Sequence, residues 1–414
     1  MPDLPVTIRH VAAAAGVHPA TASRALNPET RTLVSDKTAR RVLKVAKSLG
    51  YHPNPMARTL RTRRSHTIGV LIPDLTNPLF PPIIRGLEDR LAAAGYVALI
   101  GNTDGDGGRE RFVFEQMRAR RVDGFVVATA RLRDPLLAEA ARAELPVVLV
   151  NRVTEGHSFP AVCVDNEQGS RLVVCHLAGL GHRRIAHIAG PQDVSTGPSR
   201  LRGFLAGLQA RGLEADPDLI VYATAFSIQE GVRCCRELLR RTGRWSAVAA
   251  ANDMLAVGAY SALDEAGLRC PEDVSVSGFN DMPFIDRLSP PLTSVRFPHY
   301  QVGTEAAQLL LERLVGPGAR AGPDAGQAAR AGADAGQAGR AGAAAGPAGR
   351  AGPVGGEDAG GQPVSGNTGP VKILFLAPEL IARGSTARAA HEPARRGGSG
   401  AVPAGGRPRS PRIS

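Results

Sequence analysis

The chain is poor in cysteine and lacks long apolar runs. Among its 414 residues there are five cysteines, and no two of them form a CxxC pair: Cys163, Cys175, Cys234, Cys235 and Cys270. We therefore expect reduced, buried thiols and no metal site. No stretch approaches the roughly 18 apolar residues of a membrane-spanning helix, and the N-terminus is polar and has no apolar signal segment. These absences predict a cytoplasmic protein without a membrane partner.

Motifs of catalysis and phosphate binding are also missing. No nucleophile and base stand at a spacing that covalent catalysis uses, and no cluster of potential ligands has metal-site spacing. The segment Gly105-Asp-Gly-Gly108 resembles a phosphate-binding loop only superficially, because the Lys-Ser/Thr pair that follows such loops is absent. We expect neither an enzyme nor a protein with a cofactor.

Positive charge is concentrated at the two ends of the chain. Residues 1–65 hold 12 Lys and Arg against 3 Asp and Glu, a net +9 of the chain's +12. Residues 386–414 hold 6 Lys and Arg against 1 Asp or Glu. The body, counted without residues 316–370, is slightly acidic, with 28 Lys and Arg against 30 Asp and Glu. A basic head on an acidic body is typical of a protein whose head alone meets phosphate, although basic surfaces also serve solubility alone.

Residues 6–27 have the pattern of two short helices joined by a tight turn. Thr7 is placed to cap the first helix. One face of this helix is apolar at three- and four-residue spacing and consists of Ile8, Val11, Ala12 and Ala15. Gly16 then supplies the left-handed backbone that a sharp turn between helices requires.

The second helix is predicted from Pro19, which suits a first turn because it lacks an N–H, to about Leu26. Its inward face is apolar and consists of Ala22, Ala25 and Leu26. Its other side offers Ala20, Thr21, Ser23 and Arg24 to a partner. We interpret the unit as a helix-turn-helix that places this side in the major groove of double-stranded DNA.

A third helix and a short charged segment complete the head. The third helix is predicted from Ser35 to Gly50. Asn54 can cap one further helical turn, about 54–61, which is too short and too charged to be stable alone. Leu60 beside Arg61 fits a wedge in the DNA minor groove, and an ordinary linker whose leucine packs on the next domain fits equally well.

The body, residues 66–315 completed by 371–386, alternates short apolar runs with helical patterns. Strands are predicted at 68–72, 96–100, 124–127, 147–150, 185–189, 221–222, 248–251, 274–278 and 371–376. This series predicts an α/β fold of two lobes with parallel sheets, and a ligand cleft between the lobes beyond the strand ends. Polar residues follow several strands, although Asp165 and Asn252 among them equally suit ordinary helix caps.

Residues 316–370 interrupt this body. Arg-Ala-Gly recurs at Arg320, Arg330, Arg340 and Arg350, and the segment has no large apolar residues to bury, so we expect disorder. A long insertion is tolerable because the entropy cost of closing a loop grows slowly with its length. Residues 387–414 are expected to be a basic disordered tail, which either adds nonspecific DNA affinity or has no role.

Several motifs resemble the lactose-repressor (LacI/GalR) family of transcriptional regulators. In the head they are Thr7-Ile8, Val11-Ala12, Ala15-Gly16-Val17, Thr21, Ser23-Arg24 and Asn27, and Asn54-x-x-Ala57-Arg58-x-Leu60 resembles the hinge helix of that family. In the body they include Leu180-Gly181-His182-Arg183, Arg200-x-x-Gly203-Phe204, Ala251-Asn252-Asp253 and Pro291-Leu292-Thr293. The resemblance implies an all-α helix-turn-helix head, residues 1–65, and a body like a two-lobed periplasmic binding protein.

The resemblance also implies which residues of the head contact DNA. Bases would be read by Pro19, Ala20 and Arg24, and the minor groove would hold Ala57, Leu60 and Arg61. The remaining DNA-binding positions are Thr7, His18, Thr21, Ser23, Asn27 and Asn54. Two residues depart from the family, since His10 replaces the usual Asp and His18 the usual capping Ser. Because Pro19 and Ala20 are short and apolar, readout by hydrogen bonds depends mainly on Arg24.

An effector site in the cleft between the lobes follows from the same resemblance. Arg200 would bind ligand hydroxyls or a carboxylate through its planar fork, and Phe226 would lie against a ring. Around them would stand Asp74, Phe80, Arg152, Asn252 and Asn280. Asn280 replaces the acidic residue common in the family, and an amide both donates and accepts, so a different hydroxyl pattern is expected. A carbohydrate is the favoured effector, with nucleobases and other metabolites as alternatives.

Together these features predict a ligand-responsive transcriptional regulator, a repressor that binds a near-palindromic operator as a homodimer and is nucleoid-associated when bound to DNA. Ligand would move the lobes and fold or melt the two hinge segments, which couples effector binding to operator affinity. The alternative is a sugar-binding carrier without a DNA role, because the body alone resembles periplasmic binding proteins. The basic head argues against that alternative.

Overall fold

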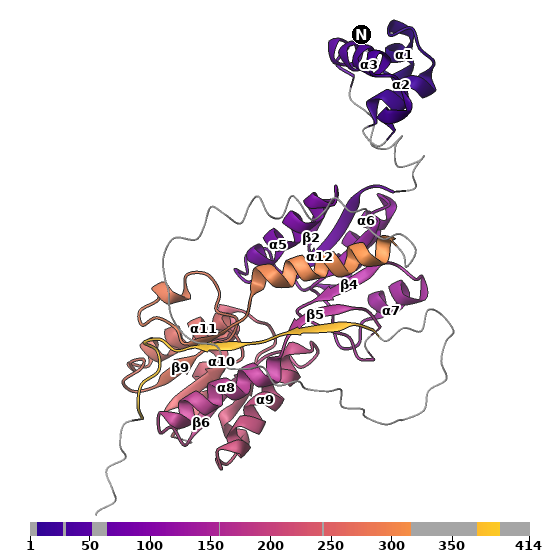
Figure 1. The fold of residues 1–414 in the computed structure, drawn as a ribbon. Coiled ribbons are helices and arrows are strands. Elements are labelled where there is room, and N and C mark those ends of the chain that lie inside the picture. The colour runs from indigo at the N-terminus through magenta and orange to yellow at the C-terminus, as the bar shows by residue number, and fades with distance from the viewer. Residues whose placement is uncertain are drawn as a thin grey trace, which may run out of the picture. The chain divides into compact units, whose positions relative to one another are not determined.

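The computed structural model describes residues 6–27, 30–51, 64–156, 158–241, 244–315 and 371–389 (Figure 1). The predicted hinge helix with Asn54, Ala57, Leu60 and Arg61, the insertion at 316–370 and the tail beyond Ala389 lie outside the described residues. The described residues divide into two compact units. Unit 1 holds those up to Val164, among them the head, with 193–195, 298–315 and 371–376, and unit 2 holds 165–192, 196–297 and 377–389.

The head consists of three helices around a small core. They are α1 (Ile8–Ala14), α2 (Pro19–Leu26) and α3 (Asp36–Ser48), with a 3₁₀ turn, η1 (Arg31–Leu33), before α3. The core consists of Val11, Ala12, Ala15, Ala22, Ala25, Ala39, Val42 and Ala46. Gly16 has a φ of +62° between α1 and α2, which only glycine adopts at little cost. The predicted helix-turn-helix is confirmed.

Unit 1 is built on a six-stranded parallel sheet in the order β11-β5-β4-β3-β1-β2. Its strands are β1 (Thr67–Ile72), β2 (Val97–Asn102), β3 (Gly124–Val127), β4 (Val147–Val150), β5 (Ala161–Val164) and β11 (Ile373–Leu376). Its helices are α5 (Phe80–Ala93), α6 (Gly107–Ala119), α7 (Pro135–Arg142) and α12 (His299–Val315). Strands β3, β4 and β5 are buried along their whole length, which explains their continuous apolar sequence.

Two glycines bring α5 and α12 into close contact. A Cβ atom on Gly86 would lie 2.0 Å from the Tyr300 carbonyl oxygen, and one on Gly303 would lie 1.9 Å from the Ile83 carbonyl oxygen. No larger residue fits at either position without moving a helix. The last helix before the insertion is therefore packed firmly onto unit 1.

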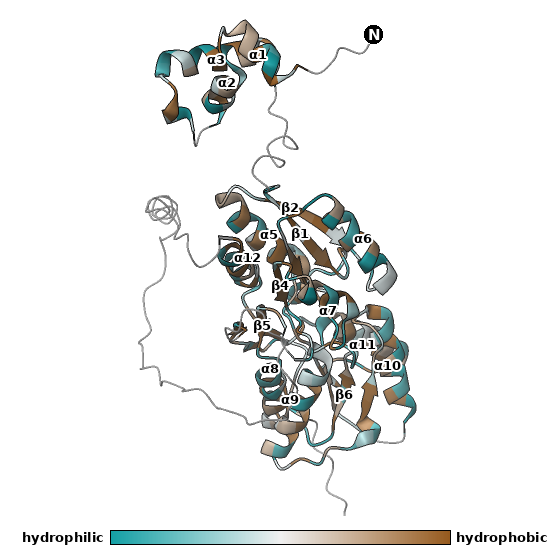
Figure 2. Ribbon diagram, turned by 90° about the vertical axis from the view of Figure 1, so that its right-hand side faces the viewer, coloured by the Kyte–Doolittle hydropathy of each residue, from teal (hydrophilic) through white to brown (hydrophobic). Residues whose placement is uncertain are grey.

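Unit 2 contains a four-stranded parallel sheet in the order β7-β6-β8-β9. These strands are β6 (Ile185–Ala189), β7 (Ile220–Tyr222), β8 (Ala247–Ala250) and β9 (Ser275–Ser277). Helices α8 (Asn166–Gly179) and α9 (Thr196–Ala210) pair on one side of the sheet, and α10 (Ile228–Arg240) and α11 (Asp253–Glu265) on the other (Figure 2). Two short 3₁₀ turns, η2 (Pro217–Leu219) and η3 (Ile285–Arg287), lie in the connections.

Residues 371–389 add a strand to each unit. In unit 1, β11 pairs in parallel with β5, and in unit 2, β12 (Glu379–Ile381) pairs antiparallel with β10 (Ser294–Arg296). The packed chain continues to Ala389, whose N–H donates to the Leu180 carbonyl oxygen at 2.9 Å. The described contacts of this segment thus reach Ala389.

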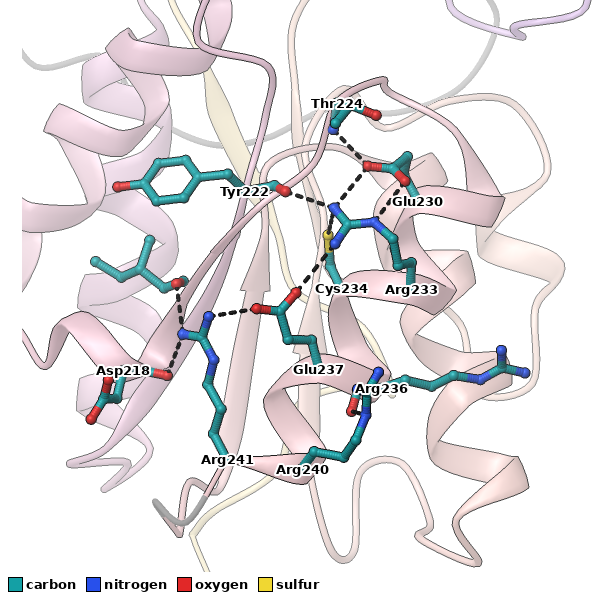
Figure 3. Close-up of polar contacts among 11 residues, drawn as sticks. Asp218, Tyr222, Thr224, Glu230, Arg233, Cys234, Arg236, Glu237, Arg240 and Arg241 are labelled. Atoms are coloured by element: carbon teal, nitrogen blue, oxygen red, sulfur yellow. Dashed lines mark hydrogen bonds and ion pairs between the residues drawn. The ribbon is translucent and has the colours of Figure 1, made fainter.

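Arg233 of α10 and Arg241 at its C-terminal cap cover the outer edge of β7 (Figure 3). Arg233 Nη2 donates to the Tyr222 carbonyl oxygen at 2.7 Å, and Arg241 Nη1 donates to that of Ile220 at 3.1 Å. Each arginine is held in turn by a glutamate of the same helix, Glu230 or Glu237. These carbonyl groups of the edge strand therefore have hydrogen-bond partners without a further strand.

The cysteines are free thiols: Cys163, Cys234 and Cys235 are buried, and Cys175 and Cys270 are half-buried. The expectation of buried thiols is thus confirmed for three of the five.

Among the described helices, none is both long and apolar enough to cross a membrane. In the same part of the chain, no three His, Cys, Asp or Glu side chains gather as metal ligands.

Candidate functional site

The two histidines that replace the usual head residues both act as helix caps. His10 Nδ1 accepts a hydrogen bond from the Thr7 N–H at 3.3 Å, and His18 Nδ1 accepts one from the Ala20 N–H at 3.2 Å. Thr7 and His18 are the residues that immediately precede α1 and α2. An imidazole that accepts through Nδ1 carries its proton on Nε2. Histidine therefore supplies the acceptor that a carboxylate or hydroxyl supplies in other heads.

Helix α2 presents the side that was predicted to meet DNA. Ala20 and Arg24 are exposed, and Thr21 and Ser23 are half-buried. The last turn of the helix is fixed by the chain that follows, because Thr30 Oγ1 donates to the Arg24 carbonyl oxygen at 3.3 Å. Arg24 thus projects from a helix that is held at both ends. Asn27 lies at its C-terminal cap, and Pro19 occupies its first position.

Arg200 is the centre of a polar cluster in unit 2. The residue is only 2% exposed, and its guanidinium donates from Nε to Asn166 Oδ1 at 2.8 Å. It also donates from Nη1 to the Ala251 carbonyl oxygen at 2.6 Å and from Nη2 to Asn280 Oδ1 at 3.2 Å. These bonds hold the planar group in one orientation, as a site for hydroxyl or carboxylate oxygens requires.

Two aromatic rings flank this guanidinium. Its Cζ atom lies 3.8 Å from the centroid of the Phe279 ring and 5.8 Å from that of Phe226. Phe226 is half-buried and packs over Gly190, where a Cβ atom would lie 2.5 Å from the ring. A guanidinium within about 6 Å of a ring centroid is attracted to the ring, so both rings help to hold Arg200 in place.

Asn280 lies in a loop whose backbone is strained. Its φ is +113°, and Asp281 and Phe284 have φ values of +52° and +74°, in the region that favours glycine. The Asn280 N–H donates to the Val295 carbonyl oxygen at 2.9 Å. Strain of this kind persists only where surrounding contacts determine it.

Asp253 ties the same loop to the start of α11. Its carboxylate accepts hydrogen bonds from the Met282 N–H at 2.8 Å and from Ser294 Oγ at 2.5 Å. The residue is 0% exposed, and burial raises the pKa of Asp253 to about 7 although both hydrogen bonds lower it.

The polar residues at two strand ends act as helix caps. Asn252 Oδ1 accepts from the Leu255 N–H at 2.9 Å at the start of α11. Asp165 Oδ1 accepts from the Gln168 N–H at 2.9 Å at the start of α8. The capping interpretation of both residues is thus confirmed, and Asn252 still adjoins Ala251, which contacts Arg200.

In unit 1 the expected ligand residues have different surroundings. Asp74 Oδ1 accepts from the Thr76 N–H at 2.8 Å in the turn after β1, and Phe80 is 2% exposed in the core. Arg152 follows β4, and its Nη1 lies 3.5 Å from the Thr129 carbonyl oxygen. Among the described residues, no hydrogen bond or ion pair joins Asp74, Phe80 and Arg152 to one another. In unit 2, by contrast, Arg200 donates to Asn280 and lies beside Phe226.

Several buried polar atoms around Arg152 have no partner among the described residues. They are Arg152 Nε, Asn151 Oδ1 and Thr154 Oγ1. Burial lowers the pKa of Arg152 to about 10, while Asp193 and Glu110 raise it. Buried donors and acceptors without a protein partner are the groups that a polar ligand or an ordered water satisfies.

Asn166 and Phe279 also contact Arg200, but no ligand role is predicted for either from the sequence. Asn166 follows β5 in one of the polar segments at strand ends, so a signal for it is present in the sequence. Phe279 gives no such signal, because an apolar residue at the end of β9 has the pattern of an ordinary core residue.

The head and the body match known families separately. Residues 7–54 match the model for bacterial regulatory proteins of the lacI family, and residues 174–328 match that for a periplasmic binding protein-like domain. A helix-turn-helix head on a ligand-binding type of body defines a DNA-binding transcriptional regulator.

The chain belongs to the lacI family of bacterial regulatory proteins. It is 35% identical to the HTH-type transcriptional repressor CytR of Escherichia coli (strain K12) over 319 residues, 76% of this chain and 92% of that one. It is 36% identical to the ribose operon repressor of Bacillus subtilis (strain 168) over 306 residues, 74% and 90% of the two chains. A solved structure of the transcriptional regulator CelR with cellobiose has a TM-score of 0.62 at 29% identity, covering 92% of this chain and 99% of that chain. The predicted fold class and family are confirmed.

Proposed function

We propose that this regulator is a repressor that binds a near-palindromic operator as a homodimer and responds to a sugar. The observation that carries the proposal is the presence in one chain of a capped reading helix with an exposed Arg24 and a buried Arg200 cluster beside an aromatic ring. Relatives that cover most of the chain are named as repressors, and the CelR relative was solved with cellobiose.

In this proposal, α2 reads bases in the major groove. Arg24 donates two hydrogen bonds to a guanine, Ala20 touches a thymine methyl group, and Pro19 packs beside it. The backbone phosphates are contacted by Thr7, His18, Thr21, Ser23 and Asn27. His18 offers its Nε2–H there, because its Nδ1 is used in the cap. The hinge residues Asn54, Ala57, Leu60 and Arg61 complete the proposed contacts, in the minor groove.

The dimer follows from the small reading surface of one head. A single helix of eight residues reads only a few base pairs, so one head alone binds DNA with little specificity. Two heads on a two-fold axis double the number of bases read, which accounts for the near-palindromic operator.

The proposed effector contacts in unit 2 are Arg200, Phe226, Asn252 and Asn280. The amide oxygens of Asn252 and Asn280 already accept from Leu255 and Arg200, so each residue offers a ligand its Nδ2 donor group. Two amide donors and a half-buried ring suit a ligand rich in oxygen acceptors, such as a sugar. Asp74, Phe80 and Arg152 remain the proposed contacts in unit 1.

A thermal-shift screen of the full chain with D-ribose, cellobiose and cytidine tests the effector. A ligand at about 100 times its Kd stabilises the folded protein by about 2.7 kcal/mol, which raises the melting temperature by several degrees. We expect a sugar to produce this shift, and Arg200→Met to abolish it. Arg202→Met is the matched control, because Arg202 lies on the same helix and pairs with Glu167 at the surface.

Two outcomes contradict this part of the proposal. One is that no sugar raises the melting temperature of the parent chain while cytidine does. The other is that Arg200→Met keeps the full shift produced by the active sugar.

A further inference from the structure

The segment that follows the insertion is anchored tightly to unit 2. The Arg383 N–H donates to Thr293 Oγ1 at 2.8 Å, and Arg383 Nη1 donates to the Leu292 carbonyl oxygen at 2.7 Å. Ser385 is 0% exposed, accepts from the Thr293 N–H at 2.8 Å and donates to the Val276 carbonyl oxygen at 2.6 Å. The backbone and side chain of Arg383 and the nearby Ser385 are therefore all fixed by hydrogen bonds to residues of unit 2 that precede the insertion.

The guanidinium of Arg383 also pairs with Asp281. Arg383 Nη1 lies 2.7 Å from Asp281 Oδ1, and the two side chains are only 14% and 5% exposed. This contact is an ion pair without hydrogen-bond geometry, whereas the other carboxylate oxygen accepts a hydrogen bond from Arg296 Nε at 2.6 Å. The side chain of Arg296 is 50% exposed. Removal of one partner from a buried ion pair leaves an unpaired buried charge, which is costly, whereas loss of an exposed cation costs little. Arg383 is thus the buried cationic partner of Asp281, and Arg296 is its exposed hydrogen-bond donor.

Asp281 is the neighbour of Asn280 in the strained loop. Both residues have positive φ values, so the loop does not hold its shape by backbone preference. The Asp281 N–H donates to Ser294 Oγ at 3.1 Å, which is a single neutral hydrogen bond. The carboxylate of this residue adds the buried ion pair with Arg383 and the exposed hydrogen bond from Arg296.

We propose that Arg383 is a positioning residue for the effector site: through Asp281 it fixes the loop that presents Asn280. The proposal rests on the proposed function only in assigning Asn280 to effector binding. In this proposal, a residue that follows the insertion at 316–370 sets the geometry of a loop that precedes the insertion in the sequence.

Hydrogen exchange measured by mass spectrometry on the full chain tests this positioning role. In Arg383→Ala, we expect amides of residues 280–282 to exchange about tenfold faster or more, with β6 and β8 unchanged. Arg296→Ala is the matched control, because it removes the exposed partner of the same carboxylate, and we expect a change of less than about threefold. Arg383→Lys keeps the charge and is expected to restore part of the protection.

Unchanged protection of 280–282 in Arg383→Ala overturns the proposal, as does an equal effect of Arg296→Ala. A second variant, Asp281→Asn, removes the other partner and is expected to loosen the same amides. If both variants lose protection throughout unit 2, Arg383 is a general folding residue and the positioning role is wrong.

The sugar screen separates this proposal from the proposed function. The exchange result requires no ligand, so a screen in which no sugar binds leaves it intact. Asn280→Ala in the same screen tests the effector role alone, because an unchanged ligand shift in that variant removes Asn280 from the effector site.

Discussion

At Asp253, burial and hydrogen bonding act on the pKa in opposite directions, and burial prevails. The pKa is raised from 3.8 to about 7, so the folded state binds this proton more tightly than the unfolded state does. The stability that the protonated carboxyl contributes is complete below about pH 4 and is lost as the pH rises through about 7.

Asp253→Asn removes this titration. We expect the difference in free energy of unfolding between the parent and the variant to change by up to about 1.4 kcal/mol per pH unit between about pH 4 and 7. Urea unfolding followed by circular dichroism across this range measures it. Burial lowers the pKa of His187 to about 4. Because His187 titrates in both proteins, its contribution to the free energy of unfolding cancels in the difference between them. A difference that is independent of pH contradicts the assignment.

At Arg24, the prediction concerns specificity rather than affinity alone. Arg24→Ala is expected to cost about 1–3 kcal/mol on a preferred duplex and little on random DNA, because it removes the proposed contact with a base. Arg41→Ala on α3 is the control: Arg41 is exposed outside the reading helix, and its loss is expected to weaken both duplexes alike. Fluorescence anisotropy titrations measure these affinities. Equal losses for both duplexes in Arg24→Ala refute the base contact.

Some features of single residues can be predicted from the sequence, and others depend on the folded chain. The position of Arg200 on a helix of the body follows from its motif, but its ring partner Phe279 follows only from three-dimensional packing. The departures at His10 and His18 are visible in the sequence. That both imidazoles take over the capping role depends on side-chain orientation, which sequence patterns do not contain.

At the scale of elements, α10 protects the edge of β7. Hydrogen bonds from Arg233 lower the pKa of Glu230 to about 2, so this pair stays charged near neutral pH. The charged pair keeps Arg233 beside β7, where Arg233 donates a hydrogen bond to the Tyr222 carbonyl oxygen.

Replacing both Arg233 and Arg241 with alanine is expected to expose this edge and promote association of sheets between molecules. Light scattering over a concentration series measures the effect, and we expect aggregation at a lower concentration than for the parent. Arg236→Ala is the control on the same helix, because Arg236 pairs with Glu265 and not with the strand. Identical scattering curves for the double variant and the parent rule out the edge-protection role.

The sequence predicts strands that are buried on both faces better than short strands that depend on a distant partner. Residues 124–127, 147–150 and 185–189 were expected as strands, and they form β3, β4 and β6 at those bounds. They are buried on both faces, so their apolar sequence alone identifies them. The short strands β10 and β12 escape prediction because each holds three residues and gains its pairing from a partner far along the chain.

At the scale of the whole molecule, residues 371–389 are held by β11, β12 and the contacts of Ser385 rather than by chain connectivity alone. A chain cut at a protease site placed after Ala345 is therefore expected to keep its C-terminal fragment. Native size-exclusion chromatography followed by a denaturing gel detects the fragment in the main peak.

Ser385→Glu tests the basis of that association, because it forces a charge into a fully buried position. We expect this variant to release the fragment after cutting, while Glu379→Ala at an exposed position retains it. Release of the fragment from the cut parent chain refutes the account of the segment.

The division into a basic head and an α/β body follows from charge and periodicity, so the sequence predicts the organisation well. The contact between Asp281 and Arg383 does not follow, because the two residues stand on opposite sides of a long insertion and no local pattern joins them. Long-range ion pairs of this kind depend on the completed fold.

The most direct test of the central claim is selection of duplexes from a random DNA library by the full-length chain, followed by affinity measurement on the enriched sequence. The account predicts a near-palindromic site bound at least about 10³-fold more tightly than random DNA, with an affinity that falls steeply as salt rises. Adding the sugar that stabilises the protein is expected to change that affinity. Failure to enrich any sequence, or equal binding of enriched and random duplexes, contradicts the account.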